Sequence, residues 1–191
     1  MSHEFFQQFP HLRGLFGEQW PSCALGPGKP QRDRHAQLAA LDDATLFAGA
    51  KVHDANLAAC CRSGLWLVFD FLDESHQISQ DITTVEGSYW HGIMHRREPD
   101  YMNAKYWFRR VPRHPVFEPL GEAARALFHA HAESGPQAKF LEHAQPWDPF
   151  AFVDLCEAIA RGKARCETLA REVAMAEWRL LFTHCYEGAI A

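Results

Sequence analysis

The chain has 191 residues, 47% of them hydrophobic and 23% charged, which is the composition expected of a single soluble globular domain. Its formal net charge of −5 argues against general nucleic-acid binding, and it has no apolar run of the roughly 18 residues that a membrane-spanning helix needs. The six cysteines form no C-x-x-C pair and the N-terminus resembles no secretory signal. We therefore expect a cytoplasmic protein with reduced thiols, in which Cys60, Cys61, Cys156 and Cys166 are unbridged and buried.

Proline and glycine recur in the first part of the chain, in "FPHLRG", "WPS" and "LGPGKPQ". Because both residues interrupt regular structure, we expect residues 1–40 to form an irregular N-terminal arm. Residues 41–191 are expected to form one helical domain, which begins with a short helix from Asp42 to Ala48.

The middle of the chain is predicted to hold a long helix. Asp54 can cap a helix that starts at "ANLAACC", and apolar residues at helical spacing extend the pattern from about Gly64 to Ile82. The stretch "TTVEGS" is expected to be a loop, after which Ser88 caps a helix "YWHGIMHRR" that ends before Pro99. A further short helix is expected at "YMNAKYWFRRV".

Three more helices are predicted for the remainder of the chain. The first covers "PLGEAARALFHAHAES", the second opens with Asp148 and Pro149 and closes at Gly162, and the third covers residues 164–186. No alternating strand pattern persists in the sequence. We therefore predict an all-α fold, a single-domain helical bundle with an irregular N-terminal arm.

Two histidines open the segment "WHGIMHRREPDYMNAKYWFRR". His91 and His95 are four residues apart and share one side of a helix, while Asp73 and His76 are three apart on the preceding helix. If the two helices pack together, these four side chains can converge on one divalent metal, zinc or iron. With 12 histidines in the chain, about 0.75 H-x-x-x-H pairs arise by chance, so the hypothesis depends on this context and not on the spacing. The alternative is that the histidines form hydrogen bonds inside a polar core.

Residues 96–113 form a basic island on an acidic chain. Six basic residues minus two acidic ones give +4, which leaves −9 for the rest of a chain of net charge −5. This favours a small anionic or sugar-like ligand over a polyanion. The alternative is a solvated helix face with salt bridges. In the pocket hypothesis, acids near Asp70 partner some of the arginines, and the unpaired remainder binds the anion. We expect an anion-binding pocket whose substrate-binding residues are Arg96, Arg97, Asn103, Lys105, Tyr106 and Arg109.

The phrase "HGIMHRREPDYMNAKYWFRRVPRHPVF", with "FLDESHQISQ" before it, resembles a family of uncharacterised bacterial and fungal proteins that carry nearly the same wording. The resemblance covers residues 66–118 and implies a shared unit that links the two helices. The resemblance implies no activity and no catalytic residue for this chain.

Two hypotheses about function follow. In the first, the chain is an enzyme acting on a small molecule, with His76, Glu74 and Glu98 as groups for proton transfer and a metal-bound water for hydrolysis. In the second, the same histidines, arginines and acids form a buried polar network in a ligand-binding or structural protein. No G-x-S-x-G, P-loop or G-x-G-x-x-G motif favours another reaction class.

Overall fold

The computed structural model describes residues 2–17, 21, 23–131 and 135–191, and within these ranges the chain forms helices joined by loops, without a strand. The predicted all-α fold is confirmed. Among the helices described, none is long and apolar enough to cross a membrane. In chain order they are α1 (Ser2–Gln8), η1 (Pro10–Leu12), α2 (Arg13–Phe16), η2 (Arg32–Arg34), α3 (His35–Ala39), α4 (Asp43–Leu46), α5 (Ala55–Val68), α6 (Leu72–Ser79), α7 (Val85–Arg97), α8 (Tyr101–Phe108), α9 (Phe117–Ala130), η3 (Pro136–His143), α10 (Pro149–Ala160) and α11 (Glu167–Ile190).

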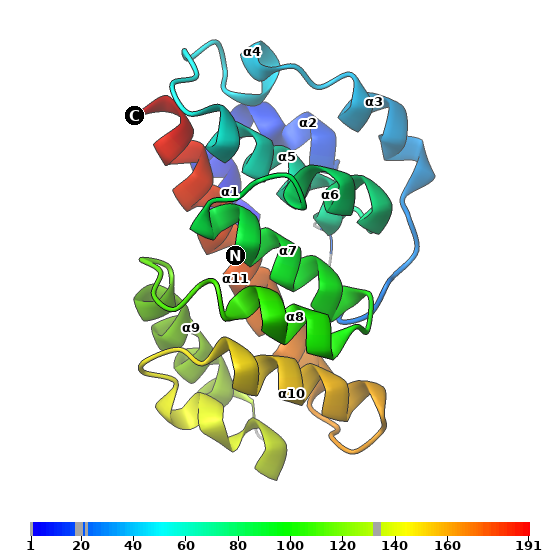
Figure 1. Cartoon of the computed structure of the whole chain (residues 1–191), viewed down its shortest axis with the longest axis vertical. Helices are drawn as coiled ribbons and strands as arrows, with labels where there is room; N and C mark the ends of the chain where they lie inside the picture. Colours follow the sequence, from blue (N-terminus) through cyan, green and yellow to red (C-terminus); the bar gives the residue numbers. More distant parts are fainter. Residues whose placement is uncertain (1, 18–20, 22, 132–134) are drawn as a thin grey trace.

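Helix α7 lies at the centre of the bundle and is buried from Gly87 to Arg97. Helices α5, α6 and α8 pack against it, α10 packs on α8, and α11 packs on α5 and α9 (Figure 1). Gly64 of α5 permits the close approach of α7, because a Cβ atom there would lie 2.7 Å from the Trp90 ring. The Gly64 carbonyl also accepts a hydrogen bond of 2.7 Å from the Trp178 indole of α11. Helix α7 therefore carries its polar side chains into the interior of the protein.

Among the described helices, aspartate side chains cap four, namely α4, α5, α8 and α10, and the sequence predicts the caps at Asp54 and Asp148. The carboxylates of Asp42, Asp54 and Asp148 each accept a hydrogen bond of 2.8 Å from a backbone N–H of the first helical turn. Gly162 follows α10 with a φ of 68°, the left-handed conformation that ends many helices. The last helix continues to Ile190, four residues beyond the predicted end.

The predicted continuous helix from Gly64 to Ile82 is wrong, because the chain breaks between α5 and α6. Asp70 has a φ of 67°, in the left-handed region that is incompatible with a continuing α-helix. Its carboxylate pairs with the Arg97 guanidinium and accepts a hydrogen bond of 3.1 Å from the Lys29 amide. The break lets α6 fold back onto both α5 and α7.

The start of α7 also differs from the prediction. Thr84, and not Ser88, caps the helix, and its hydroxyl oxygen accepts a hydrogen bond of 3.2 Å from the Gly87 amide. Ser88 is a buried residue of the helix itself. Threonine and serine can both cap a helix. The helix begins at Val85, inside the stretch expected to be a loop, so the residue before it, Thr84, is the cap.

The first 40 residues are more helical than expected. Helices α1 and α2 bury several aromatic side chains, and the Phe9 ring lies 5.6 Å from the Phe182 ring of α11, centroid to centroid. Farther along, the Gly26 carbonyl accepts a hydrogen bond of 2.9 Å from the Arg97 guanidinium. The described parts of this segment thus contribute to the core, and a domain boundary at residue 40 stays a prediction.

All six cysteines are buried free thiols. This confirms the expectation of unbridged, buried cysteines. Burial raises the pKa of Cys23 to about 11 and that of Cys156 to about 12, so both side chains stay protonated at neutral pH.

Candidate metal centre

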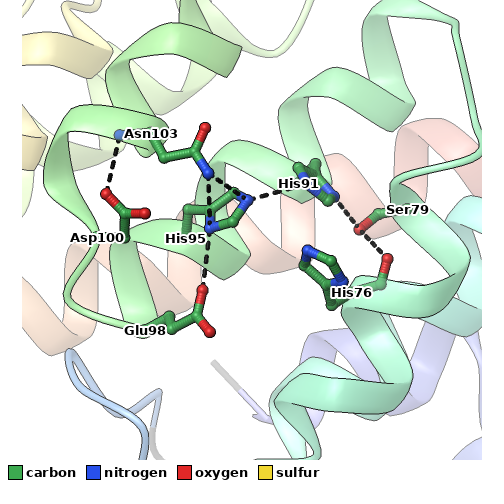
Figure 2. Close-up of polar contacts among 7 residues, drawn as sticks. All are labelled: His76, Ser79, His91, His95, Glu98, Asp100 and Asn103. Atoms are coloured by element: carbon green, nitrogen blue, oxygen red, sulfur yellow. Dashed lines mark hydrogen bonds and ion pairs between the residues drawn. The ribbon is translucent and has the colours of Figure 1, made fainter.

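Three of the histidines singled out in the sequence meet between two helices. His76 comes from α6, and His91 and His95 come from successive turns of α7 (Figure 2). Their ring centroids lie 4.8 Å apart for His76 and His91, 5.4 Å for His76 and His95, and 4.6 Å for His91 and His95. One ring nitrogen from each lies within 4.8 Å of the other two, a spacing that a single metal ion can bridge.

Asp73 and Glu74 do not join this group. Both lie in the first turn of α6, where they line a separate hollow of about 610 Å³ beside Gly28 and His35. Asp73 is exposed, and the Glu74 carboxylate lies 3.3 Å from His35 Nε2. The expected metal-ligand role of Asp73 and the expected proton-transfer role of Glu74 therefore need correction. The cause is the break at Asp70, which points the start of α6 toward the N-terminal segment.

Hydrogen bonds fix the orientation of the His91 ring. Its Nδ1 lies 2.8 Å from the hydroxyl oxygen of Ser79, which in turn donates to the Ser75 carbonyl at 2.9 Å. A hydroxyl has one proton, so Ser79 donates either to His91 Nδ1, which places the His91 proton on Nε2, or to the Ser75 carbonyl. In the second arrangement the Ser79 oxygen accepts from His91 Nδ1–H, and the lone pair of this imidazole is on Nε2.

The same reasoning applies to the His95 ring. Its Nδ1 lies 3.0 Å from the Glu98 carboxylate, which can only accept a hydrogen bond. His95 therefore carries its proton on Nδ1 and its lone pair on Nε2. The two Nε2 atoms, of His91 and His95, face each other at 3.0 Å.

Both imidazoles are neutral at physiological pH. Burial lowers the pKa of His91 to about 3, with the nearby His95 and His76 acting in the same direction. Burial also lowers the pKa of His95, against the opposing effect of the Glu98 carboxylate. Two neutral imidazoles with their Nε2 atoms at 3.0 Å either share one N–H···N hydrogen bond, with the proton on His91 Nε2, or direct both lone pairs toward a common cation.

Helix α8 covers the other side of the histidines. The Asn103 amide nitrogen lies 3.0 Å from Nε2 and 3.4 Å from Nδ1 of His95, so it stands over the ring and not in line with either nitrogen. One turn later, the Trp107 ring lies 4.3 Å from the His91 ring, centroid to centroid, and is only partly buried. Phe108, the next residue, is fully buried and anchors α8 in the core.

Sequence reasoning missed Ser79 and the site-facing position of Trp107. The i, i+4 spacing of Asn103 and Trp107 could have indicated a shared helix face. Ser79 offers no such signal, because a buried serine near a helix end is common and its histidine partner lies on another helix.

Arg96 and Arg97 are buried in the core and paired with internal carboxylates. Arg96 lies 2.5 Å from the Glu177 carboxylate of α11, whose other oxygen accepts a hydrogen bond of 3.1 Å from the Tyr89 hydroxyl. Arg97 pairs with Asp70 and donates to backbone carbonyls. The expectation that these two arginines bind a substrate anion is therefore wrong, because neither cation is exposed or unpaired.

The remaining predicted binding residues lie on α8 or at its end. Lys105 pairs with the Asp154 carboxylate of α10, and Tyr106 is exposed beneath the Arg109 guanidinium, which lies 5.6 Å from its ring centroid. Of the predicted set, only Asn103 contacts the histidines.

A second group of potential ligands is formed by Glu86, His114 and His184. The Glu86 carboxylate lies 3.8 Å from His114 Nε2 and 3.6 Å from His184 Nε2. His114 Nδ1 accepts a hydrogen bond of 3.2 Å from the Val116 amide, so its proton is on Nε2. This ring presents an N–H and not a lone pair to the group, which disfavours metal binding there.

No protein-family model matches the chain, and neither a curated protein nor a solved structure shows significant similarity to it.

Proposed function

We propose that this protein is a metal-dependent enzyme in which His76, His91 and His95 bind one divalent transition metal, zinc or iron. The metal would activate a water molecule for hydrolysis or proton transfer on a small polar or anionic substrate. The observation that carries the proposal is the convergence of three imidazoles, in which the Nε2 atoms of His91 and His95 lie 3.0 Å apart.

In the arrangement with the His91 proton on Nδ1, the lone pairs of both Nε2 atoms face each other, and a cation between them removes their repulsion. With metal–nitrogen bonds of about 2.0–2.1 Å, two ligands of one metal lie about 2.9–3.4 Å apart, which agrees with the separation of the two Nε2 atoms. A divalent metal therefore accounts for the geometry.

The surroundings of the histidines resemble those of known metal ligands in general. Metal-binding histidines commonly donate their other N–H to a carboxylate or hydroxyl, which is the role of Glu98 toward His95 and of Ser79 toward His91. Three neutral imidazoles preserve the full charge of the metal and leave a coordination position for water. In this proposal His76 is a ligand and Glu98 orients His95, so neither acts as the general base.

The alternative hypothesis, a buried polar network without catalysis, describes a different group of buried polar residues. Arg96, Glu177 and Tyr89 form a closed set of charges and hydrogen bonds that needs no ligand. We assign these residues to stability and the histidines to function. The buried free thiols also support the expected cytoplasmic location.

Metal binding by the purified protein tests the proposal. After loading with Zn²⁺ and desalting, we expect one metal per chain by elemental analysis, and loss of that metal in His91→Gln and His95→Gln. His129→Gln, which changes an exposed histidine of α9, is the matched control. If the wild-type protein binds no stoichiometric metal, or the two variants retain it, the proposal fails. Catalysis is tested by hydrolysis of 4-nitrophenyl acetate, which should depend on the metal and on His91.

A further inference from the structure

We propose that the substrate binds along Asn103 and Trp107 of α8 and Arg110, which lies in the turn after this helix, and that Arg110 recognises a carboxylate at the far end of the substrate. This inference rests on the proposed metal centre and specifies its substrate class. It replaces the expected anion pocket at Arg96 and Arg97, which the internal ion pairs exclude.

The three residues follow one another along the chain. Asn103 and Trp107 are four residues apart and share one side of α8, and Arg110, in the turn after the helix, lies against the Trp107 ring, so the three form one stripe. The first two contact the His95 and His91 rings directly. The stripe therefore starts at the metal ligands and leads away from them.

Arg110 is the cation on this stripe. Its guanidinium carbon lies 5.0 Å from the Trp107 ring centroid, and the side chain is exposed. Among the described residues, Arg96, Arg97 and Lys105 each have a carboxylate partner, whereas Arg110 has none. A cation without an internal counter-ion is available to an anionic ligand.

The length of the stripe indicates the size of the substrate. From Asn103 to the end of α8 at Phe108 the helix spans about 7.5 Å at a rise of about 1.5 Å per residue, and Arg110 lies just beyond it. A substrate with an oxygen on the metal and a carboxylate at Arg110 is therefore on the scale of a five- or six-carbon dicarboxylic acid. The Trp107 ring would contact its apolar middle, and the Asn103 amide would bond to the oxygen nearest the metal.

The experiment uses the whole protein loaded with Co²⁺, whose visible absorption changes when a carboxylate enters its coordination sphere. Adipate and butyrate are titrated separately, because only adipate can reach both the metal and Arg110. We expect adipate to bind about tenfold more tightly than butyrate to the wild-type protein, and Arg110→Gln to remove this preference. Arg109→Gln is the matched control, since Arg109 stacks on Tyr106.

Each outcome has a distinct meaning. If wild-type protein binds both acids equally, or if Arg110→Gln retains the preference, or if Arg109→Gln loses it as well, the role of Arg110 is overturned while the metal centre stands. If the wild-type protein binds no Co²⁺, the metal centre fails, and this inference fails with it.

Discussion

At the scale of single residues, the hydroxyl proton of Ser79 decides what the His91 ring can do. When that proton goes to the Ser75 carbonyl, the serine oxygen accepts from His91 and directs the imidazole lone pair toward His95. Ser79, which is not a metal ligand, therefore sets the tautomer of the proposed ligand His91.

Substitution of Ser79 tests this role. In Ser79→Ala, His91 loses the acceptor for its Nδ1–H, and we expect Zn²⁺ affinity to fall about 10- to 100-fold in a chelator competition assay. Ser63→Ala is the control, since Ser63 is equally buried and bonds to Ser75 without touching a histidine. An equal loss of affinity in both variants would show that general destabilisation, and not the His91 tautomer, is responsible.

The ion pair between Arg96 and Glu177 leads to a different expectation. Glu177→Gln leaves the buried Arg96 cation without a counter-charge, which should lower the free energy of unfolding by about 3–5 kcal/mol in urea denaturation. The double variant Arg96→Met/Glu177→Gln also removes the unpaired buried cation, and it should recover part of the lost free energy of unfolding. The folded Glu177→Gln protein should still bind one Zn²⁺ per chain, and loss of metal there would contradict the separation of the two polar groups.

At the scale of elements, the break between α5 and α6 determines which residues reach the histidine cluster. The break at Asp70 turns α6 onto α7 so that His76 and Ser79 face the histidines, while Asp73 and Glu74 face another hollow. A continuous helix would not have allowed this packing.

Asp70 can stabilise the break in two ways, through its charge, which pairs with Arg97, and through its left-handed backbone conformation. Asp70→Asn and Asp70→Ala both remove the charge that pairs with Arg97, but asparagine tolerates the left-handed conformation better than alanine. We therefore expect Asp70→Ala to be less stable than Asp70→Asn by about 1 kcal/mol in denaturant unfolding. Equal stability of the two variants would mean that the backbone conformation contributes nothing.

These elements also show what a sequence can predict. The caps at Asp42, Asp54 and Asp148 are local, because each carboxylate bonds to a backbone N–H within three residues. The break at Asp70 depends on Arg97 and Lys29, which are distant in the sequence, so helical periodicity did not reveal it. The candidate site likewise combines features that are local in the sequence with contacts between residues that are distant in it.

The convergence of the histidines could be predicted because His91 and His95 share one side of a helix in a segment rich in polar and aromatic residues, and His76 lies on the preceding helix. The burial of Arg96 and Arg97 could not, because their partners Glu177 and Asp70 lie on elements whose packing the sequence does not specify. A cluster of cations in a sequence therefore cannot separate an anion site from a set of internal ion pairs.

At the scale of the whole molecule, the group formed by Glu86, His114 and His184 joins the start of α7, the loop before α9 and α11. Burial lowers the pKa of His114 to about 4, with His184 acting in the same direction and Glu86 opposing it. An unfolded chain, with an ordinary histidine pKa near 6.5, binds more protons than the folded chain between these values.

Stability should therefore fall as the pH is lowered from about 6.5 toward 4. The contribution of His114 to this loss is up to about 3 kcal/mol, and His114→Gln should make the unfolding free energy less dependent on pH over the same interval. Urea denaturation at pH 7.5, 5.5 and 4.5 measures the effect, with His129→Gln as the exposed control. A pH dependence that is identical in His114→Gln and wild type would contradict it.

The burial of every cysteine has a practical consequence for spectroscopy. Since all six thiols are enclosed in the native protein, a cysteine introduced at Met102, which is 75% exposed, would be the preferred point of attack for a nitroxide reagent. Position 102 adjoins Asn103 on α8, so the unpaired electron of such a label would sit close to the histidine cluster. Its relaxation in the presence of a paramagnetic ion such as Cu²⁺ would report the distance between label and ion in solution.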